Sequence, residues 1–406
     1  MVSLPQNIQV NAARRKLIET AERVLAGFTT PCEVELAQGE ILRVGTDAPK
    51  FRIKFHDDRV LLRGTDEFAF AEAFVNGDID IEGDMMAFFD VRNVLKSMIG
   101  MGALTKFWTQ MLFSNPTNVN KSAIQHHYEF GEDFFLCFMD KSYHLYSHGF
   151  FENDAETLER ACERKMDVMF EWANLKPGMR VLDIGAGWGP VIRHCSPRGV
   201  HVTSLTLADD SLKHITKMIK DNNFIGEVRK EDFLVHRPEQ PYDAIVILGV
   251  IEHIPYYQKF FERCWELLKP GGRIYMDASA DIEKFTVSRF IREFIYPGTH
   301  TYMILQDVLQ EQLYHGFMPV KVEQDNHNYM LTMRHWAQRF EANKDMIRQR
   351  WGDQVYRAFW LYLWSGAYAF GNDVLQAYHL VAERQAVRGP RPGVRRRVRN
   401  FFQQLF

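Results

Sequence analysis

Residues 181–189 read Val-Leu-Asp-Ile-Gly-Ala-Gly-Trp-Gly, and they carry the strongest indication of the fold. Its first four residues are typical of a buried strand, and Lys176-Pro177-Gly178 supplies a turn before it. The glycines that follow let the backbone approach a ligand that a Cβ atom would repel. The spacing is GxGxG, with Asp183 two residues before Gly185, which favours a nucleoside without a pyrophosphate. A glycine-rich turn alone is equally compatible with a structural role.

Further apolar runs follow at helix-length intervals, over residues 200–207, 244–248 and 274–276. This alternation of strand and helix predicts an α/β fold with a parallel sheet covered by helices on both faces. Ligands of such sheets bind at the carboxyl ends of the strands. We therefore expect a ribose-reading group near Thr206 and place Glu231 and Asp232, at the third strand-to-helix junction, beside an adenine.

The first part of the chain has a different pattern. Residues 9–26, 68–75 and 85–113 are predicted to be helical, and residues 32–36, 41–44, 51–55 and 60–62 to be short strands. The polar segment 114–118, Ser-Asn-Pro-Thr-Asn, is the expected domain boundary. We divide the chain into an α+β domain (1–115), a catalytic domain (116–384) and a basic amphipathic tail (385–406) in which arginines alternate with Val, Phe and Leu.

Composition narrows the class of protein. At 406 residues, with 46% apolar residues and a formal charge of −3, the chain suits two packed domains and offers no global attraction for nucleic acid. Its five cysteines form no CxxC pair, which fits reduced thiols in a cytoplasm and no metal framework. No apolar stretch reaches about 18 residues, so we expect a soluble or peripheral protein.

Three ordered segments resemble class I methyltransferases: residues 181–189, 242–254 (YDAIVILGVIEHI) and 267–276 (LLKPGGRIYM). Residues 126–134 (HHYEFGEDF), 146–151 (YSHGFF), 157–159 (TLE) and 359–370 (FWLYLWSGAYAF) narrow the resemblance to the cyclopropane fatty acid synthase family. The likeness is strong from 124 to 384 and weak over 30–90. It implies a Rossmann-like, seven-stranded methyltransferase domain that uses S-adenosylmethionine as methyl donor.

The resemblance also implies which residues contact the donor. Where this family has Glu-Gln after the second strand, this chain has Asp210-Ser211, so one side-chain contact differs. The expected donor-binding residues are Tyr146, Ser147, Asp183, Gly185, Gly187, Gly189, Thr206, Ser211, Glu231 and Asp232.

The chemistry of the reacting centre follows from the substrate of the family. An alkene that attacks a sulfonium methyl group becomes a carbocation, which aromatic faces in a dry pocket stabilise. A base must then remove a proton, either to close a cyclopropane or to leave a branched alkene. The resemblance implies that a bound bicarbonate is this base, held by a cysteine, a glutamate, a histidine, a backbone group and a tyrosine.

This chain keeps two of those ligands, Glu252 and Tyr329, and changes two. His148 stands at the cysteine position and Asp277 at the histidine position. A carboxylate added beside Glu252 repels an anion unless His148 is protonated, which argues against bicarbonate in its usual place. Our hypothesis is that Asp277, paired with His148, is the base, or that the altered site releases a methylated alkene.

Each of these residues also has a structural interpretation. Glu252 and His253 could form a hydrogen-bonded pair at a strand end, and His148 could be a core histidine. Aromatic residues at helical spacing usually pack in the core. That interpretation applies to Tyr329 and to the set Trp336, Trp360, Trp364 and Phe370.

The favoured function is methyl transfer to an unsaturated phospholipid by a homodimer at the inner membrane surface, with the N-terminal domain and the tail helping to dock lipid. Arginines and phenylalanines of the tail suit an anionic membrane surface, although a solvated terminus explains them equally well. One alternative is an amine N-methyltransferase in which Glu252 and His253 bind nitrogen. Another is a lipid-binding protein that has lost catalysis.

Overall fold

The computed structural model describes residues 12–63, 66–90, 130–254, 256–283, 286–296 and 301–389. The chain forms two compact units. The smaller unit contains residues 1–109 and 343–368, and the larger unit contains residues 110–342 and 369–406. Residues 91–129, which include the expected boundary, and the tail from 390 lie outside the described residues, so the predicted division into domains stays a prediction.

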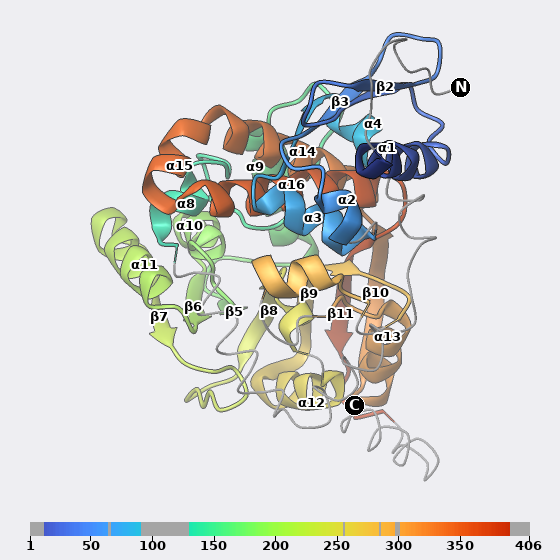
Figure 1. Cartoon of the computed structure of the whole chain (residues 1–406). Coiled ribbons are helices and arrows are strands. Elements are labelled where there is room, and N and C mark those ends of the chain that lie inside the picture. The colour runs from blue at the N-terminus through green and yellow to red at the C-terminus, as the bar shows by residue number, and fades with distance from the viewer. Residues whose placement is uncertain are drawn as a thin grey trace. The chain divides into compact units, whose positions relative to one another are not determined.

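The larger unit contains a seven-stranded sheet with the strand order β10-β11-β9-β8-β5-β6-β7 (Figure 1). The five strands from β9 to β7 run parallel, and β11 lies antiparallel between β9 and β10. This arrangement confirms the predicted α/β class. The strands are β5 (Arg180–Ile184), β6 (His201–Thr206), β7 (Gly226–Lys230), β8 (Tyr242–Leu248), β9 (Leu268–Ala280), β10 (Phe317–Gln324) and β11 (Gln376–Arg384).

Helices cover both faces of this sheet. Neighbouring residues of a strand point to opposite faces. On one face, Ile245 of β8 and Met276 of β9 share an apolar cluster with Phe260 of α12. On the other face, Asp277 of β9 meets Lys165 of α9. The helices are α8 (Glu132–Leu136), α9 (Leu158–Trp172), α10 (Pro190–Cys195), α11 (Asp209–Asn222), α12 (Tyr257–Leu267), α13 (Leu305–Tyr314) and α14 (Asn326–Ala342), with short turns η1 (Ser196–Arg198), η2 (Ile251–His253) and η3 (Ile291–Ile295).

The smaller unit has a four-stranded sheet of order β2-β1-β3-β4, in which only β1 and β3 run parallel, and this confirms the predicted α+β module. Its strands are β1 (Cys32–Glu35), β2 (Ile41–Val44), β3 (Phe51–Phe55) and β4 (Ile79–Gly83). Its helices are α1 (Ala12–Leu25), α2 (Val60–Arg63), α3 (Glu67–Val75), α4 (Met85–Phe89), α15 (Lys344–Trp351) and α16 (Asp353–Gly371), the last up to Tyr368.

One predicted strand of this unit is wrong, because residues 60–62 belong to helix α2. The two aspartates before it start a helical turn. The carbonyl of Asp57 accepts from Val60 N at 3.3 Å, and the carbonyl of Asp58 accepts from Leu61 N at 3.1 Å. The Asp57 side chain also accepts from Arg59 N at 3.0 Å, the kind of local bond by which aspartate begins turns and helices.

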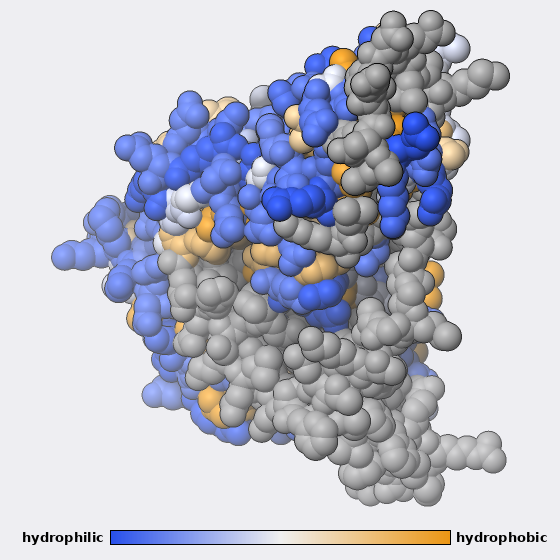
Figure 2. Space-filling view, in the orientation of Figure 1, coloured by the Kyte–Doolittle hydropathy of each residue, from blue (hydrophilic) through white to orange (hydrophobic). Residues whose placement is uncertain are grey.

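The surface of the described chain is mainly hydrophilic on the face drawn in Figure 2, with small apolar patches between charged groups. Among the described residues, no helix combines the length and apolar composition needed to cross a membrane.

Arg357 of α16 ties helix and sheet together inside the smaller unit. It donates to the backbone carbonyls of Phe74 and Ile79, each at 3.2 Å. It also donates to Asp80 and to Asp353, each at 2.7 Å, and its guanidinium lies over the Phe74 ring. One nearly buried side chain therefore satisfies two buried carbonyls and balances two carboxylates.

We predict that Arg357→Leu lowers the free energy of unfolding of the smaller unit by about 2–4 kcal/mol, because two buried carbonyls and two carboxylates lose their donors. Calorimetry of the full chain measures the change. Lys344→Leu, at an exposed position of α15, is the matched control and should shift the transition little. Equal effects of the two substitutions would contradict this role of Arg357.

Candidate active site

The glycine-rich loop lies between β5 and α10 and is held against the neighbouring strands. Gly185 has a φ of +77°, and a Cβ atom there would lie 2.4 Å from a methyl group of Val250. Its backbone N–H and that of Ala186 donate to the carbonyl of Leu205, at 3.0 and 2.9 Å. Glycine is therefore required at 185 both by its backbone angle and by its close approach to the segment after β8.

Several predicted donor-binding residues gather around this loop. The Ser211 hydroxyl donates to the carbonyl of Gly187 at 2.5 Å, and Thr206 ends the neighbouring strand β6. Asp183 is buried and accepts from Ser204 at 2.9 Å, and burial raises the pKa of Asp183 to about 7. The structure thus brings these residues together at the carboxyl ends of β5 and β6.

The acidic pair at the third junction makes local contacts. Glu231 interacts with His236 Nδ1 at 2.9 Å, and Asp232 accepts from Leu234 N at 2.8 Å. Their predicted contact with an adenine, like every donor contact named above, stays a prediction.

Asp277 forms a buried ion pair with Lys165, and not with the partner that was predicted from the sequence. Lys165 of α9 pairs with Asp277 Oδ2, and both side chains are 0% exposed. Asp277 Oδ1 accepts from the Ser147 hydroxyl at 3.0 Å and from the Gly249 N–H at 2.8 Å. Lys165 also donates to the Ser147 hydroxyl at 2.9 Å. The expected pairing of Asp277 with His148 is therefore wrong, because an ammonium group balances this carboxylate.

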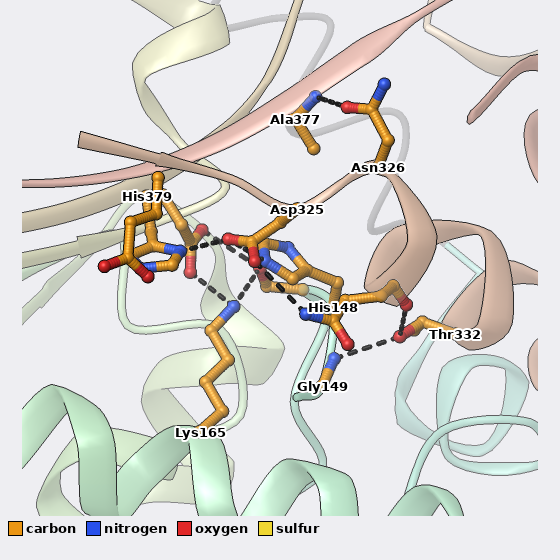
Figure 3. Close-up of polar contacts among 12 residues, drawn as sticks. His148, Gly149, Lys165, Asp325, Asn326, Thr332, Ala377 and His379 are labelled. Carbon is orange, nitrogen blue, oxygen red and sulfur yellow. Dashed lines mark hydrogen bonds and ion pairs between the residues drawn. The ribbon is translucent and has the colours of Figure 1, made fainter. Parts of the chain in front are cut away.

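His148 belongs to a second polar group, which Figure 3 shows beside the first. Its Nε2 lies 3.1 Å from Asp325 Oδ2, and His379 Nδ1 bonds to the same oxygen from strand β11. Asn328 donates to Asp325 Oδ1 at 3.2 Å. Burial, with the charge of Lys165, lowers the pKa of His148, so the imidazole is neutral near pH 7. Although burial alone would raise the pKa of Asp325, the hydrogen bonds from the two histidines lower it.

Glu252 forms the third group, at the turn η2 that follows β8. Its Oε1 accepts from the backbone N–H and the hydroxyl of Ser279, at 2.8 and 2.9 Å. Its Oε2 is buried and has no hydrogen-bond partner in the described structure. Burial raises the pKa of Glu252 to about 7, and the nearby charge of Asp277 acts in the same direction. A carboxyl group with a pKa near 7 and an oxygen free of hydrogen bonds suits a catalytic role.

These groups do not fit the bicarbonate that the resemblance implies. A carboxylate-like anion needs several hydrogen-bond donors. Asp277 already binds three of the donors here: the Ser147 hydroxyl, the Gly249 N–H and Lys165. The lowered pKa of His148 leaves it without the positive charge that would offset a further anion beside Glu252. The side-chain carboxylate of Asp277 takes up the donors that a free anion would use.

Aromatic rings flank the histidine. Tyr329 lies 4.8 Å from the His148 ring, centroid to centroid, and stacks on Phe370 at 4.1 Å. Tyr146 stacks on Trp336 at 5.3 Å. Trp360 instead stacks on Phe74 inside the smaller unit, at 5.1 Å.

His253 packs near Tyr296, with ring centroids 5.9 Å apart, and burial lowers the pKa of His253 to about 4. It is therefore uncharged near pH 7.

Sequence reasoning missed four residues of this site: Lys165, Ser279, Asp325 and His379. Lys165 had a signal, because it stands on the buried stripe of α9 with Ala161, Cys162 and Met169. A charged residue on the apolar face of an amphipathic helix needs a buried partner. The other three had no comparable signal.

Comparisons with known proteins agree with this architecture. A family model described as mycolic acid cyclopropane synthetase matches residues 116–380, and a model described only as a domain of unknown function matches residues 21–100. Cyclopropane mycolic acid synthase 2 of Mycobacterium leprae is 31% identical over 268 residues, covering 59% of this chain and 86% of the relative. Hydroxymycolate synthase MmaA4 of Mycobacterium tuberculosis is 28% identical over 297 residues, covering 67% and 95%.

Two solved structures are similar to the larger part of the chain. Mycolic acid cyclopropane synthase CmaA1 complexed with SAH and CTAB matches with a TM-score of 0.61 and 25% identity, covering 65% of this chain and 98% of that one. Coclaurine N-methyltransferase matches with a TM-score of 0.64 and 17% identity, covering 78% and 99%, which shows the fold alone. The predicted class I methyltransferase fold and the predicted family resemblance are confirmed.

We predict that Lys165→Met lowers the free energy of unfolding by about 3–5 kcal/mol, because it leaves a buried carboxylate without its counter-charge. Adding Asp277→Asn should recover more than half of the loss. Lys217→Met is the matched control, since Lys217 pairs with Asp221 at 2.7 Å on the surface, where solvent screening leaves an ion pair little effect on stability. Calorimetry distinguishes the cases, and a Lys165 variant as stable as the control would contradict the buried pair.

Proposed function

We propose that this chain, which belongs to the mycolic acid cyclopropane synthetase family, transfers a methyl group from S-adenosylmethionine to the double bond of an unsaturated fatty acyl chain. The chain is an S-adenosylmethionine-dependent methyltransferase of the class I fold. One observation supports acyl-chain methylation in particular. The carboxylate of Glu252 is buried and its Oε2 has no hydrogen-bond partner. Glu252 follows strand β8, in the segment where Val250 lies against Gly185 of the glycine loop.

The reaction makes specific demands on these residues. When the alkene takes the methyl group from sulfur, its π electron pair forms the new bond and a carbocation remains. The ionised carboxylate of Glu252 stabilises that positive charge. Asp277 holds Ser147 and Gly249 in place through its hydrogen bonds. Loss of a proton from the cation then gives a cyclopropane or a methyl-branched alkene.

The finer points of the proposal concern the substrate and its location. We propose that the acyl chain belongs to a phospholipid and that the enzyme works as a homodimer in the cytoplasm, at the inner membrane surface. The basic tail, residues 385–406, is the element proposed to meet anionic lipid. Most of that tail lies outside the described residues.

The direct test is incubation of the purified chain with methyl-labelled S-adenosylmethionine and phospholipid vesicles that carry monounsaturated chains. Mass spectrometry with localisation of double bonds should find acyl chains heavier by one methylene. Loss of the alkene identifies a cyclopropane synthase, and a retained alkene identifies a methyl-branching enzyme. An absence of label in lipid, with label instead in an added alkylamine, would replace this proposal by amine methylation.

The pKa of Glu252 predicts how the rate depends on pH. Because the carboxyl group ionises at about pH 7, the catalytically useful anion forms as the pH rises through that value, and turnover should rise with it and then level off. Glu252→Gln should lower turnover at least about 100-fold and remove this rise, while S-adenosylmethionine still binds. A variant that keeps the wild-type pH profile would show that another group titrates.

A further inference from the structure

Ser279 is the residue through which strand β9 holds the side chain of Glu252. Strand β8 ends at Leu248, which lies opposite Asp277, so the last residues of β9 run beside the turn η2 that carries Glu252. The backbone N–H of Ser279 is therefore not used by β8, and it donates to Glu252 Oε1 at 2.8 Å. The Ser279 hydroxyl donates to the same oxygen at 2.9 Å. Two donors from one residue thus converge on one carboxylate oxygen.

Further backbone contacts fix both residues. The carbonyl of Ser279 accepts from Met303 N at 2.9 Å, and the carbonyl of Glu252 accepts from Thr301 N at 3.3 Å. Both residues are buried, with Ser279 8% and Glu252 3% exposed. The contacts of Ser279 also set the rotation of the carboxylate. Because Oε1 is held twice, Oε2, which has no partner in the described structure, is the oxygen left for a bound substrate.

The charged and titratable groups beside Glu252 do not supply it with a counter-charge within the described chain. Asp277, two residues before Ser279 on the same face of β9, is negative, and Lys165 of α9 already pairs with it. Burial raises the pKa of Tyr257 on α12, so its hydroxyl is uncharged near pH 7. Burial also lowers the pKa of His253, in the turn itself, to about 4. The ionised form of Glu252 therefore depends on hydrogen bonds.

We propose that Ser279 is a positioning residue for Glu252, whose hydroxyl group turns Oε2 toward the reacting alkene and lets the carboxyl group ionise near neutral pH. This rests on the proposed function, in which the anion of Glu252 stabilises the carbocation. Burial and the charge of Asp277 raise the pKa of Glu252 to about 7, and the hydrogen bonds from Ser279 and from the backbone N–H of Glu252 act against them. Loss of a hydrogen bond to the ionised form raises that pKa further.

The first measurement is the pH profile of turnover. Ser279→Ala removes the hydroxyl group and leaves the backbone N–H in place. Because the pKa of Glu252 then rises, turnover should begin to increase only at higher pH. We expect the loss of turnover relative to the wild type to be about three- to tenfold larger at about pH 6.5 than at about pH 9. Ser279→Thr keeps a hydroxyl group and should keep the wild-type profile, and both variants should bind S-adenosylmethionine as the wild type does.

A second measurement follows the carboxyl group without turnover. Infrared spectra of the chain with ¹³C-labelled glutamate carboxyl groups, recorded as a function of pH, detect the protonation of Glu252, and Glu252→Gln identifies its band. Ser279→Ala should move this titration to higher pH. Ser204→Ala is the matched control, because the Ser204 hydroxyl donates at 2.9 Å to Asp183, another buried carboxyl group with a pKa of about 7. It should leave the Glu252 titration unchanged.

The outcomes separate the two proposals. If the wild-type chain forms no methylated lipid, the proposed function fails, and the infrared titration still decides whether Ser279 controls the ionisation of Glu252. If the wild type is active but Ser279→Ala leaves that titration unchanged and lowers turnover equally at every pH, Ser279 has only a structural role. A Ser279→Thr variant that binds the donor yet shares the altered profile of Ser279→Ala would also overturn the assignment, because it retains the hydroxyl group.

Discussion

A buried charge is stable only beside an opposite charge, and much of this site depends on one such pair. Lys165 and Asp277 are both fully buried, on a helix and a strand that are far apart in sequence. Either residue alone would cost several kcal/mol, so the helix α9 and the strand β9 are held to one relative position. The other oxygen of Asp277, Oδ1, accepts from both the Ser147 hydroxyl and the Gly249 N–H, which places His148 and the end of β8.

From this anchor the site divides into groups with separate tasks. The glycine loop closes against Leu205 and Val250, on the side where the methyl donor is expected. Glu252 keeps one oxygen bonded to Ser279 and one free. Burial and the charge of Lys165 keep His148 neutral, and Asp325 orients its ring. Glu252 depends on Ser279 of β9, and His148 depends on Asp325 before α14, so both groups are set only when these parts of the sheet have formed.

The sequence predicted the parallel centre of the sheet well, because strands buried on both faces leave continuous apolar runs. Strand β7 at one edge reads Gly-Glu-Val-Arg-Lys and is half exposed, so no apolar run marked it. Strand β10 at the other edge was missed for the same reason. The glycine loop, Glu252 and Tyr329 were predicted from motifs that resemble those of the family. The partners of His148 lie 177 and more residues away, and one sequence contains no signal for such distant contacts.

The carboxylate of Asp277 has a consequence for how the site is completed. A small anion that binds from solution is present only in proportion to its concentration, and it leaves when the medium is depleted of it. A side-chain carboxylate has an effective concentration fixed by the fold, in the way that tethering makes any second binding step intramolecular. The negative group at this position is therefore supplied once, when the polypeptide folds.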